Sequence, residues 1–155
     1  MIDTQAELEI VARLAYAALL GGLIGLEREL RGFPAGVRTV ALVALGSALF
    51  TDVSRLTAEE DRIAAGIVSG IGFLGAGVII REGYSIRGIT TAATIWAAAA
   101  VGMAVGRELY IVSGAAAVLI FGILELRPVV RSASEELRRR VTGLHEGESE
   151  RSEDV

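Results

Sequence analysis

The chain has 155 residues, a formal net charge of −4 and 52% hydrophobic residues, and its 19 glycines come in addition to that share. Soluble domains have about 45–50% apolar residues with glycine included, and disorder requires low hydrophobicity, so the composition argues against both classes. The absence of cysteine excludes disulfides, thiolate metal sites and cysteine nucleophiles. The one histidine, His145, lies in a polar tail, which removes the usual parts of histidine metal sites and catalytic triads.

Five apolar segments approach the length of about 17–25 residues that a membrane-spanning helix requires. Three of them contain no charged residue, and two of these, residues 63–80 and 88–106, are 18 and 19 residues long. A soluble bundle with buried central helices is the alternative, but two such runs in so short a chain argue against it. We therefore expect an all-α, polytopic membrane helix bundle over residues 1–126, with five transmembrane helices at residues 8–26, 37–53, 63–80, 88–106 and 109–124.

Arginine counts predict the orientation of this bundle, because short cytoplasmic loops collect positive charge. Ten arginines lie in the segments that follow the first, third and fifth helices, and three lie in the second and fourth loops. The N-terminus is therefore expected outside and the C-terminus in the cytoplasm. Residues 127–155 are expected to form a cytoplasmic amphipathic helix and a disordered acidic tail. That helix either lies on the anionic inner leaflet or is a partly formed, solvated helix.

Arg13, Arg38 and Asp52 fall within the first two predicted spans and Glu27 directly follows the first, and ionisable side chains at such depths are costly and suggest a function. The two helices run antiparallel, and their charge order is complementary. We expect two ion pairs, Arg13 with Asp52 in the outer half and Glu27 with Arg38 in the inner half. The alternative is that all four side chains extend to the membrane interfaces.

The third predicted span is rich in glycine, which lets helix backbones approach closely in lipid but lowers helix propensity. Its glycines either form a packing groove or mark a bent or unwound segment beside a substrate path. The residues assigned to this role are Gly66, Gly70, Gly72, Gly75 and Gly77. The glycines of the first and fourth spans are predicted to serve packing, namely Gly21, Gly22, Gly25, Gly102 and Gly106.

The predicted cytoplasmic end gathers basic and hydroxyl side chains. A basic cluster of Arg28, Arg38, Arg81 and Arg87 would suit a phosphate group, an anionic lipid headgroup or an acidic partner. It suits Mg²⁺ poorly, because that ion prefers carboxylate and water ligands, so we assign no metal site and no cofactor. The helix starts are polar at Thr39, Thr90 and Thr91, whose hydroxyls can cap amides or bond across helices.

Several motifs are familiar when taken together and in order. They are GGLIGLERE at residues 21–29, PAGVRT at 34–39, VALG at 43–46, SGIGFLGAGVI at 69–79 and RGITTAATIWA at 87–97. The chain resembles the MgtC/SapB family over residues 8–126. The family positions that carry over are Arg13, Glu27, Arg28, Arg38, Thr39, Gly70, Gly72, Gly75, Gly77, Arg87, Thr90, Thr91 and Trp96.

This resemblance implies a multi-pass protein of a bacterial inner membrane that is often described as a Mg²⁺ transporter. For the well-known members, regulation of other membrane machines, including the proton-translocating ATP synthase, is the favoured view. The virulence-type members also have a larger soluble C-terminal domain, and the chain is expected to be a short form without it. Functions that depend on that domain are therefore not implied.

The sequence thus predicts a non-enzymatic membrane protein that acts in Mg²⁺ or envelope homeostasis through contact with itself, as a homo-oligomer, or with another membrane protein. The alternative is a transporter of Mg²⁺ or another small ion, with a path beside residues 70–77 and with Arg38 and Arg87 at its inner mouth. An enzyme is disfavoured because no nucleophile–base pair is recognisable. The expected partners are the lipid bilayer, including anionic lipid, and other proteins, but no nucleic acid.

Overall fold

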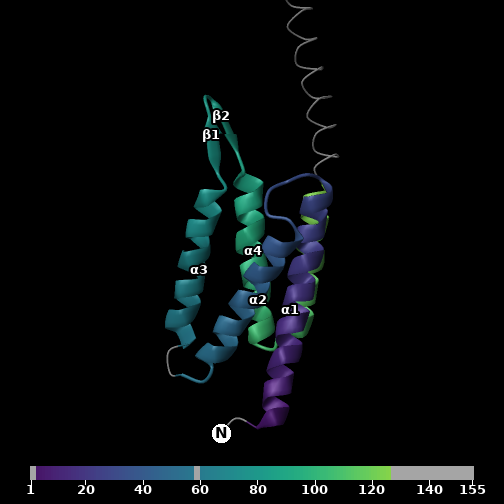
Figure 1. Cartoon of the computed structure of the whole chain (residues 1–155), viewed down its shortest axis with the longest axis vertical. Coiled ribbons are helices and arrows are strands. Elements are labelled where there is room, and N and C mark those ends of the chain that lie inside the picture. Colours follow the sequence, from purple (N-terminus) through teal and green to yellow (C-terminus); the bar gives the residue numbers. More distant parts are fainter. Residues whose placement is uncertain (1–2, 58–59, 127–155) are drawn as a thin grey trace, which may run out of the picture. The chain divides into compact units, whose positions relative to one another are not determined.

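The computed structural model describes residues 3–57 and 60–126, and over these residues the chain forms five helices and one short β-hairpin (Figure 1). In chain order the elements are α1 (Thr4–Leu30), α2 (Val37–Ser54), α3 (Glu60–Gly77), β1 (Ile80–Glu82), β2 (Ser85–Arg87), α4 (Ile89–Gly106) and α5 (Tyr110–Glu125). The all-α prediction is therefore confirmed. The helix and acidic tail predicted at residues 127–155 lie outside the described residues. α1 to α4, the hairpin and most of α5 belong to the first of two compact units, Met1–Phe121.

Three helices, α1, α2 and α4, are long and apolar enough to cross a membrane. α3 begins with the charged residues Glu60, Asp61 and Arg62, and α5 has only 16 residues. Length and composition therefore support a membrane protein with several helices, whereas the five spans and the orientation of the termini stay predictions.

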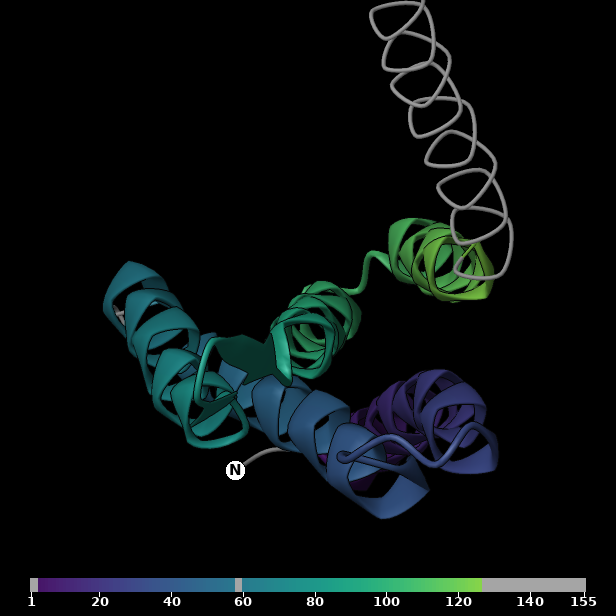
Figure 2. The same ribbon diagram turned by 90° about the horizontal axis from the view of Figure 1, so that it is seen from above.

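α2 has the central place in the first unit. Viewed along the helices, α1, α2 and α3 form a row, and α4 packs against one side of it (Figure 2). α2 makes its most extensive contacts with α1 and α4. The core between these helices is built from small apolar side chains, and Ala17, Val40, Ala44, Ala48 and Ala98 are fully buried.

Glycine explains why these three helices lie so close together. A Cβ atom added at Gly21 would lie 2.7 Å from the Val40 carbonyl oxygen, and one added at Gly106 would lie 2.7 Å from the Ala48 carbonyl oxygen. At Gly25 and Gly102 an added Cβ would likewise collide with the backbone of α2 or of the residue before it. The packing role predicted for these four glycines is confirmed. Gly22 is less crowded, with its nearest neighbour at 3.9 Å.

The third helix ends earlier than predicted. α3 stops at Gly77, and the residues predicted as its end and as a loop form the antiparallel hairpin of β1 and β2. Val78, Ile79 and Ile80 are β-branched and favour extended backbone over helix. Glycine supplies the positive φ angles that the connection requires, +61° in the turn at Gly83 and +90° at Gly88. α3 is otherwise a continuous helix, so the unwound segment considered from the sequence is wrong.

Candidate functional site

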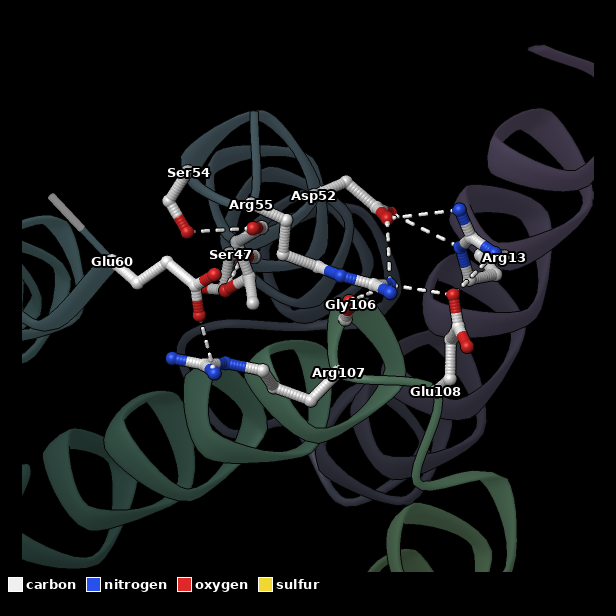
Figure 3. Close-up of polar contacts among 10 residues, drawn as sticks. Arg13, Ser47, Asp52, Ser54, Arg55, Glu60, Gly106, Arg107 and Glu108 are labelled. Carbon is white, nitrogen blue, oxygen red and sulfur yellow. Dashed lines mark hydrogen bonds and ion pairs between the residues drawn. The ribbon is translucent and has the colours of Figure 1, made fainter. Parts of the chain in front are cut away.

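The structure brings Arg13 and Asp52 together at one end of the helices, as the charge order predicted. Nη2 of Arg13 lies 3.0 Å from Oδ1 of Asp52, and Nε donates a hydrogen bond of 3.4 Å to Oδ2 (Figure 3). The two side chains are only 10% and 3% exposed. The pair therefore joins α1 to α2 out of contact with solvent.

Two further residues, Arg55 and Glu108, extend this pair into a network that the sequence analysis missed. Oε1 of Glu108 lies 3.1 Å from Nη1 of Arg13 and 2.5 Å from Nη1 of Arg55 (Figure 3). Arg55 also donates to the Gly106 carbonyl oxygen at 3.3 Å. We name Arg13, Asp52, Arg55 and Glu108 the outer network, after the side on which the sequence places it. Its two cations and two anions cancel, so it links α1, α2 and the end of α4 without a net charge.

Glu108 has an unusual backbone and a perturbed acidity. Its φ is +63°, in the left-handed region that non-glycine residues rarely adopt. Its pKa lies below the ordinary glutamate value, chiefly because of the hydrogen bond from Arg55, then because of the positive charges of Arg55 and Arg13. Next to it, Arg107 contacts Glu60 at 2.6 Å and thereby joins the end of α4 to the start of α3.

The second predicted ion pair, Glu27 with Arg38, is wrong. Glu27 is buried and pairs instead with Arg31, one helical turn away, at 2.8 Å, while Arg38 is exposed at the start of α2. Over the residues that the structure describes, Arg38 has no ion pair. Arg31 lies four residues after Glu27, on the same face of α1, so this pair forms whatever the rotation of α2 about its axis, whereas a pair with Arg38 would depend on that rotation. The residue that does join α1 to the start of α2 is Glu29, whose Oε2 accepts the Val37 amide at 2.8 Å.

The predicted basic cluster does not form one enclosed pocket. Arg28 is buried, donates to the Thr91 hydroxyl at 3.1 Å and lies 4.0 Å from the ring centroid of Phe33. By contrast, Arg38, Arg81 and Arg87 are all exposed. The predicted bond between helices is thus found at Thr91. Thr39 and Thr90 are exposed instead.

The α3 glycines differ from all the packing glycines described above. Cβ atoms added at Gly66, Gly70, Gly72 and Gly77 would meet no atom of the described chain within 4 Å. Only Gly75 has a neighbour, Ala92 of α4, at an ordinary contact distance of 3.5 Å. The α3 glycines therefore do not form the packing groove within this chain that the sequence allowed.

An open groove of about 700 Å³ runs between α2 and α3. Its walls include Val43, Phe50, Ile63, Gly66 and Gly70, and the polar side chains among its lining residues are those of Thr39 and Ser47. Residues 3–57 and 60–126 contain no group of three or more His, Cys, Asp or Glu side chains that could hold a metal ion. The groove thus offers apolar surface to a ligand, and no carboxylate lines it.

Comparison with known proteins identifies the family. A family model described as "MgtC family" matches residues 14–133. The chain belongs to the MgtC family. It is 49% identical over 133 residues to Protein MgtC of Brucella abortus, covering 83% of this chain and 56% of that protein. It is 55% identical over 98 residues to Protein MgtC of Salmonella typhimurium, covering 62% and 42%.

A third relative, an uncharacterized protein of Synechocystis, is 48% identical over 126 residues, covering 78% of this chain and 53% of the relative. The chain thus spans about half the length of the curated relatives that it matches. No solved structure matches it.

Proposed function

We propose that this MgtC-family chain is a non-enzymatic protein of the bacterial inner membrane that acts in Mg²⁺ or envelope homeostasis through contact between membrane helices. Family membership supports the physiological role. The observation that carries the mode of action is the open glycine stripe of α3, which we define as Gly66, Gly70 and Gly77. The glycines that pack helices inside this chain have backbone neighbours, whereas those of the stripe have none.

The cost of the stripe argues for a contact outside this chain. Each glycine lowers helix stability by roughly 1 kcal/mol relative to alanine. In the pairs α1–α2 and α2–α4 this cost is offset by close approach of the backbones. In lipid, where no hydrophobic force drives helices together, small residues are the usual means of helix association. A second helix on the stripe would offset the cost in α3 in the same way.

A second copy of this chain fits the stripe and the groove together. The α3 wall of the groove includes Gly66 and Gly70 of the stripe and, at about 100° per residue, extends from them to one side of the helix, whereas Phe73 lies on the other side. In a two-fold pair of α3 helices, Phe73 of a second copy would therefore face the groove of the first. Phe73 is 82% exposed, which suits such a role. Another membrane protein, such as the ATP synthase implied by the resemblance, is the alternative occupant.

The proposed topology has five spans, with the N-terminus outside and the C-terminus in the cytoplasm. Under this topology the outer network faces the periplasm, and the hairpin with Arg28, Arg31 and Arg38 faces the cytoplasm. The excess of arginine at that end supports this orientation. α3 has no charged residue after Arg62 and α5 has none before Glu125, which supports counting both helices as spans.

Cysteine crosslinking in bilayers tests the contact, and the chain has no cysteine of its own. Gly66→Cys and Gly70→Cys should each give disulfide-linked dimers, because two cysteines can bond only when their Cα atoms lie within about 7 Å. The matched control is Leu19→Cys, on an exposed face of α1, which should stay monomeric. Folded protein that gives no dimer at either glycine position would overturn the self-contact.

The transporter alternative is tested by Mg²⁺ flux into liposomes that contain the purified protein. The groove lies beside α3, where the sequence placed a path, but its apolar walls suit a hydrated cation poorly. We expect no flux above that of empty liposomes. Saturable flux that is abolished in the Arg38→Ala variant would instead support transport.

A further inference from the structure

The hairpin of β1 and β2 has features that the helix-contact function does not use. Its three pairs are Ile80 with Arg87, Arg81 with Ile86 and Glu82 with Ser85. It extends past the ends of α3 and α4, at the arginine-rich end of the first unit (Figure 1). Among the described residues no third strand pairs with it.

The hairpin has apolar, aromatic and basic side chains that are exposed to solvent. Tyr84, in the turn, is fully exposed, and more than half of the surface of Ile80 and of Ile86 is exposed. Nε of Arg81 donates to the Gly83 carbonyl oxygen at 3.1 Å, which holds the guanidinium beside the turn. No ion pair of Arg81 is present among the side chains that the structure describes. Its two terminal nitrogens are therefore available to an outside anion.

The length of chain from the first turn of α3 to the hairpin indicates how deep in the membrane the hairpin lies. Counted from Ile63, the first uncharged residue of α3, the helical rise of about 1.5 Å per residue to Gly77, about 2 Å per residue through the turn at Val78 and Ile79, and one extended step of about 3.3 Å to Ile80 add to about 28 Å. The hydrocarbon core is about 30 Å thick, and each headgroup layer adds roughly 5–7 Å. Ile80 then lies at the core boundary, and Arg81 and the turn lie in or just beyond the headgroup layer.

We propose that the hairpin binds the phosphate of an anionic phospholipid headgroup in the cytoplasmic leaflet through Arg81, with Tyr84 anchoring the turn at the interface. The planar guanidinium matches the two oxygens of a phosphodiester, and the bond at Nε fixes its direction. Tyrosine is the residue type that belongs at headgroup depth. This inference rests on α3 spanning the bilayer as proposed above, and not on the contact through the glycine stripe.

Spin labels test the proposal, because each introduced cysteine is the only one in the chain. A nitroxide at Ser85→Cys leaves Arg81 and Tyr84 intact and reports the depth of the turn by its accessibility to oxygen and to a water-soluble nickel chelate. Vesicles of phosphatidylcholine alone are compared with vesicles that also contain phosphatidylglycerol. We expect lower nickel accessibility in the anionic vesicles, with the difference reduced at high salt.

The matched variants are Arg81→Gln and Arg38→Gln, which remove the same charge from the same end of the bundle. Arg81→Gln should lower the equilibrium constant for contact between the hairpin and anionic headgroups by about fivefold, as expected for the loss of one arginine at an anionic surface. The lipid-dependent change in nickel accessibility should shrink accordingly. Arg38→Gln should leave the label at Ser85 unchanged, because Arg38 is not part of the hairpin.

A label at Val68→Cys, near the middle of α3, separates failure of the topology from failure of the headgroup proposal. A water-exposed label at Val68 would show that α3 does not span, which overturns both. A label buried at Val68 with equal nickel accessibility at Ser85 in the two kinds of vesicle would overturn the headgroup proposal alone. Shielding at Ser85 in both lipids, with broadening that grows with protein concentration, would overturn it too and assign the hairpin to a protein contact.

Discussion

The two kinds of glycine in this chain should respond in opposite ways to the same substitution. In Gly21→Ala, the new methyl group would lie 2.7 Å from both the Val40 carbonyl oxygen and the Ala44 Cβ atom. An ordinary carbon–oxygen contact is about 3.4 Å, so α1 and α2 would have to separate by about 0.7 Å. Overpacking of this kind costs about 1–3 kcal/mol of unfolding free energy. In Gly70→Ala, the methyl group meets no described atom within 4 Å.

Both variants gain the same helix propensity, about 1 kcal/mol, so the comparison between them isolates the packing term. We expect Gly21→Ala to be about 1–3 kcal/mol less stable than Gly70→Ala. The assay is equilibrium unfolding in mixed micelles with increasing sodium dodecyl sulfate, followed by far-ultraviolet circular dichroism. Equal unfolding free energies for the two variants would refute the close approach of α1 and α2. Gly70→Ala should also reduce crosslinking of Gly66→Cys, because it fills the proposed contact face without weakening the monomer.

Three further predictions concern the charged side chains. Arg13→Gln should destabilise the fold by about 3–5 kcal/mol in the same unfolding assay, since it removes the close partner of the buried Asp52 and leaves it the longer 3.9 Å contact with Arg55. The swap of Arg13→Asp with Asp52→Arg should restore part of that loss, and no restoration would mean that the pair is misassigned. Because the pKa of Glu108 is lowered by Arg55, its contribution to stability is present above about pH 4.3 and is lost as the pH falls further. Glu108→Gln should flatten this acid limb of a stability–pH curve, and an unchanged limb would exclude Glu108 as its cause. Glu29→Ala removes the acceptor at the start of α2 and should cost about 1 kcal/mol, whereas a neutral result would make that contact incidental.

Much of the fold can be predicted from the order of apolar and charged residues along the sequence. Long uncharged runs can satisfy their backbone groups in lipid only as helices, which is why the five helices could be located without a structure. The contact between Arg13 and Asp52 was predictable for a related reason. The position of a residue along a helix gives its depth, and antiparallel neighbours must pair charges of equal depth.

The other contacts of the site depend on how each helix is rotated about its own axis, and the depth of a residue in the membrane does not specify this rotation. Glu27 and Arg38 have suitable depths, yet Glu27 faces Arg31 on its own helix and Arg38 faces outward. Arg55 and Glu108 lie in loops, so only the return of the chain could bring them to the buried pair. The hairpin was missed because β-branched residues continue an apolar run without interruption.

The sequence by itself therefore determined the helices and the outer ion pair, because hydrophobic length and charge order act along the chain, and its motifs carried the resemblance to the family. Only the tertiary structure decided which glycines hold helices together and which are left open. In a bilayer, the helix face that packs against a neighbouring helix and the helix face that contacts lipid acyl chains are both apolar. Hydrophobicity along the sequence cannot distinguish these two faces. The distance from a Cβ atom added at a glycine to the nearest atom of another helix distinguishes them directly.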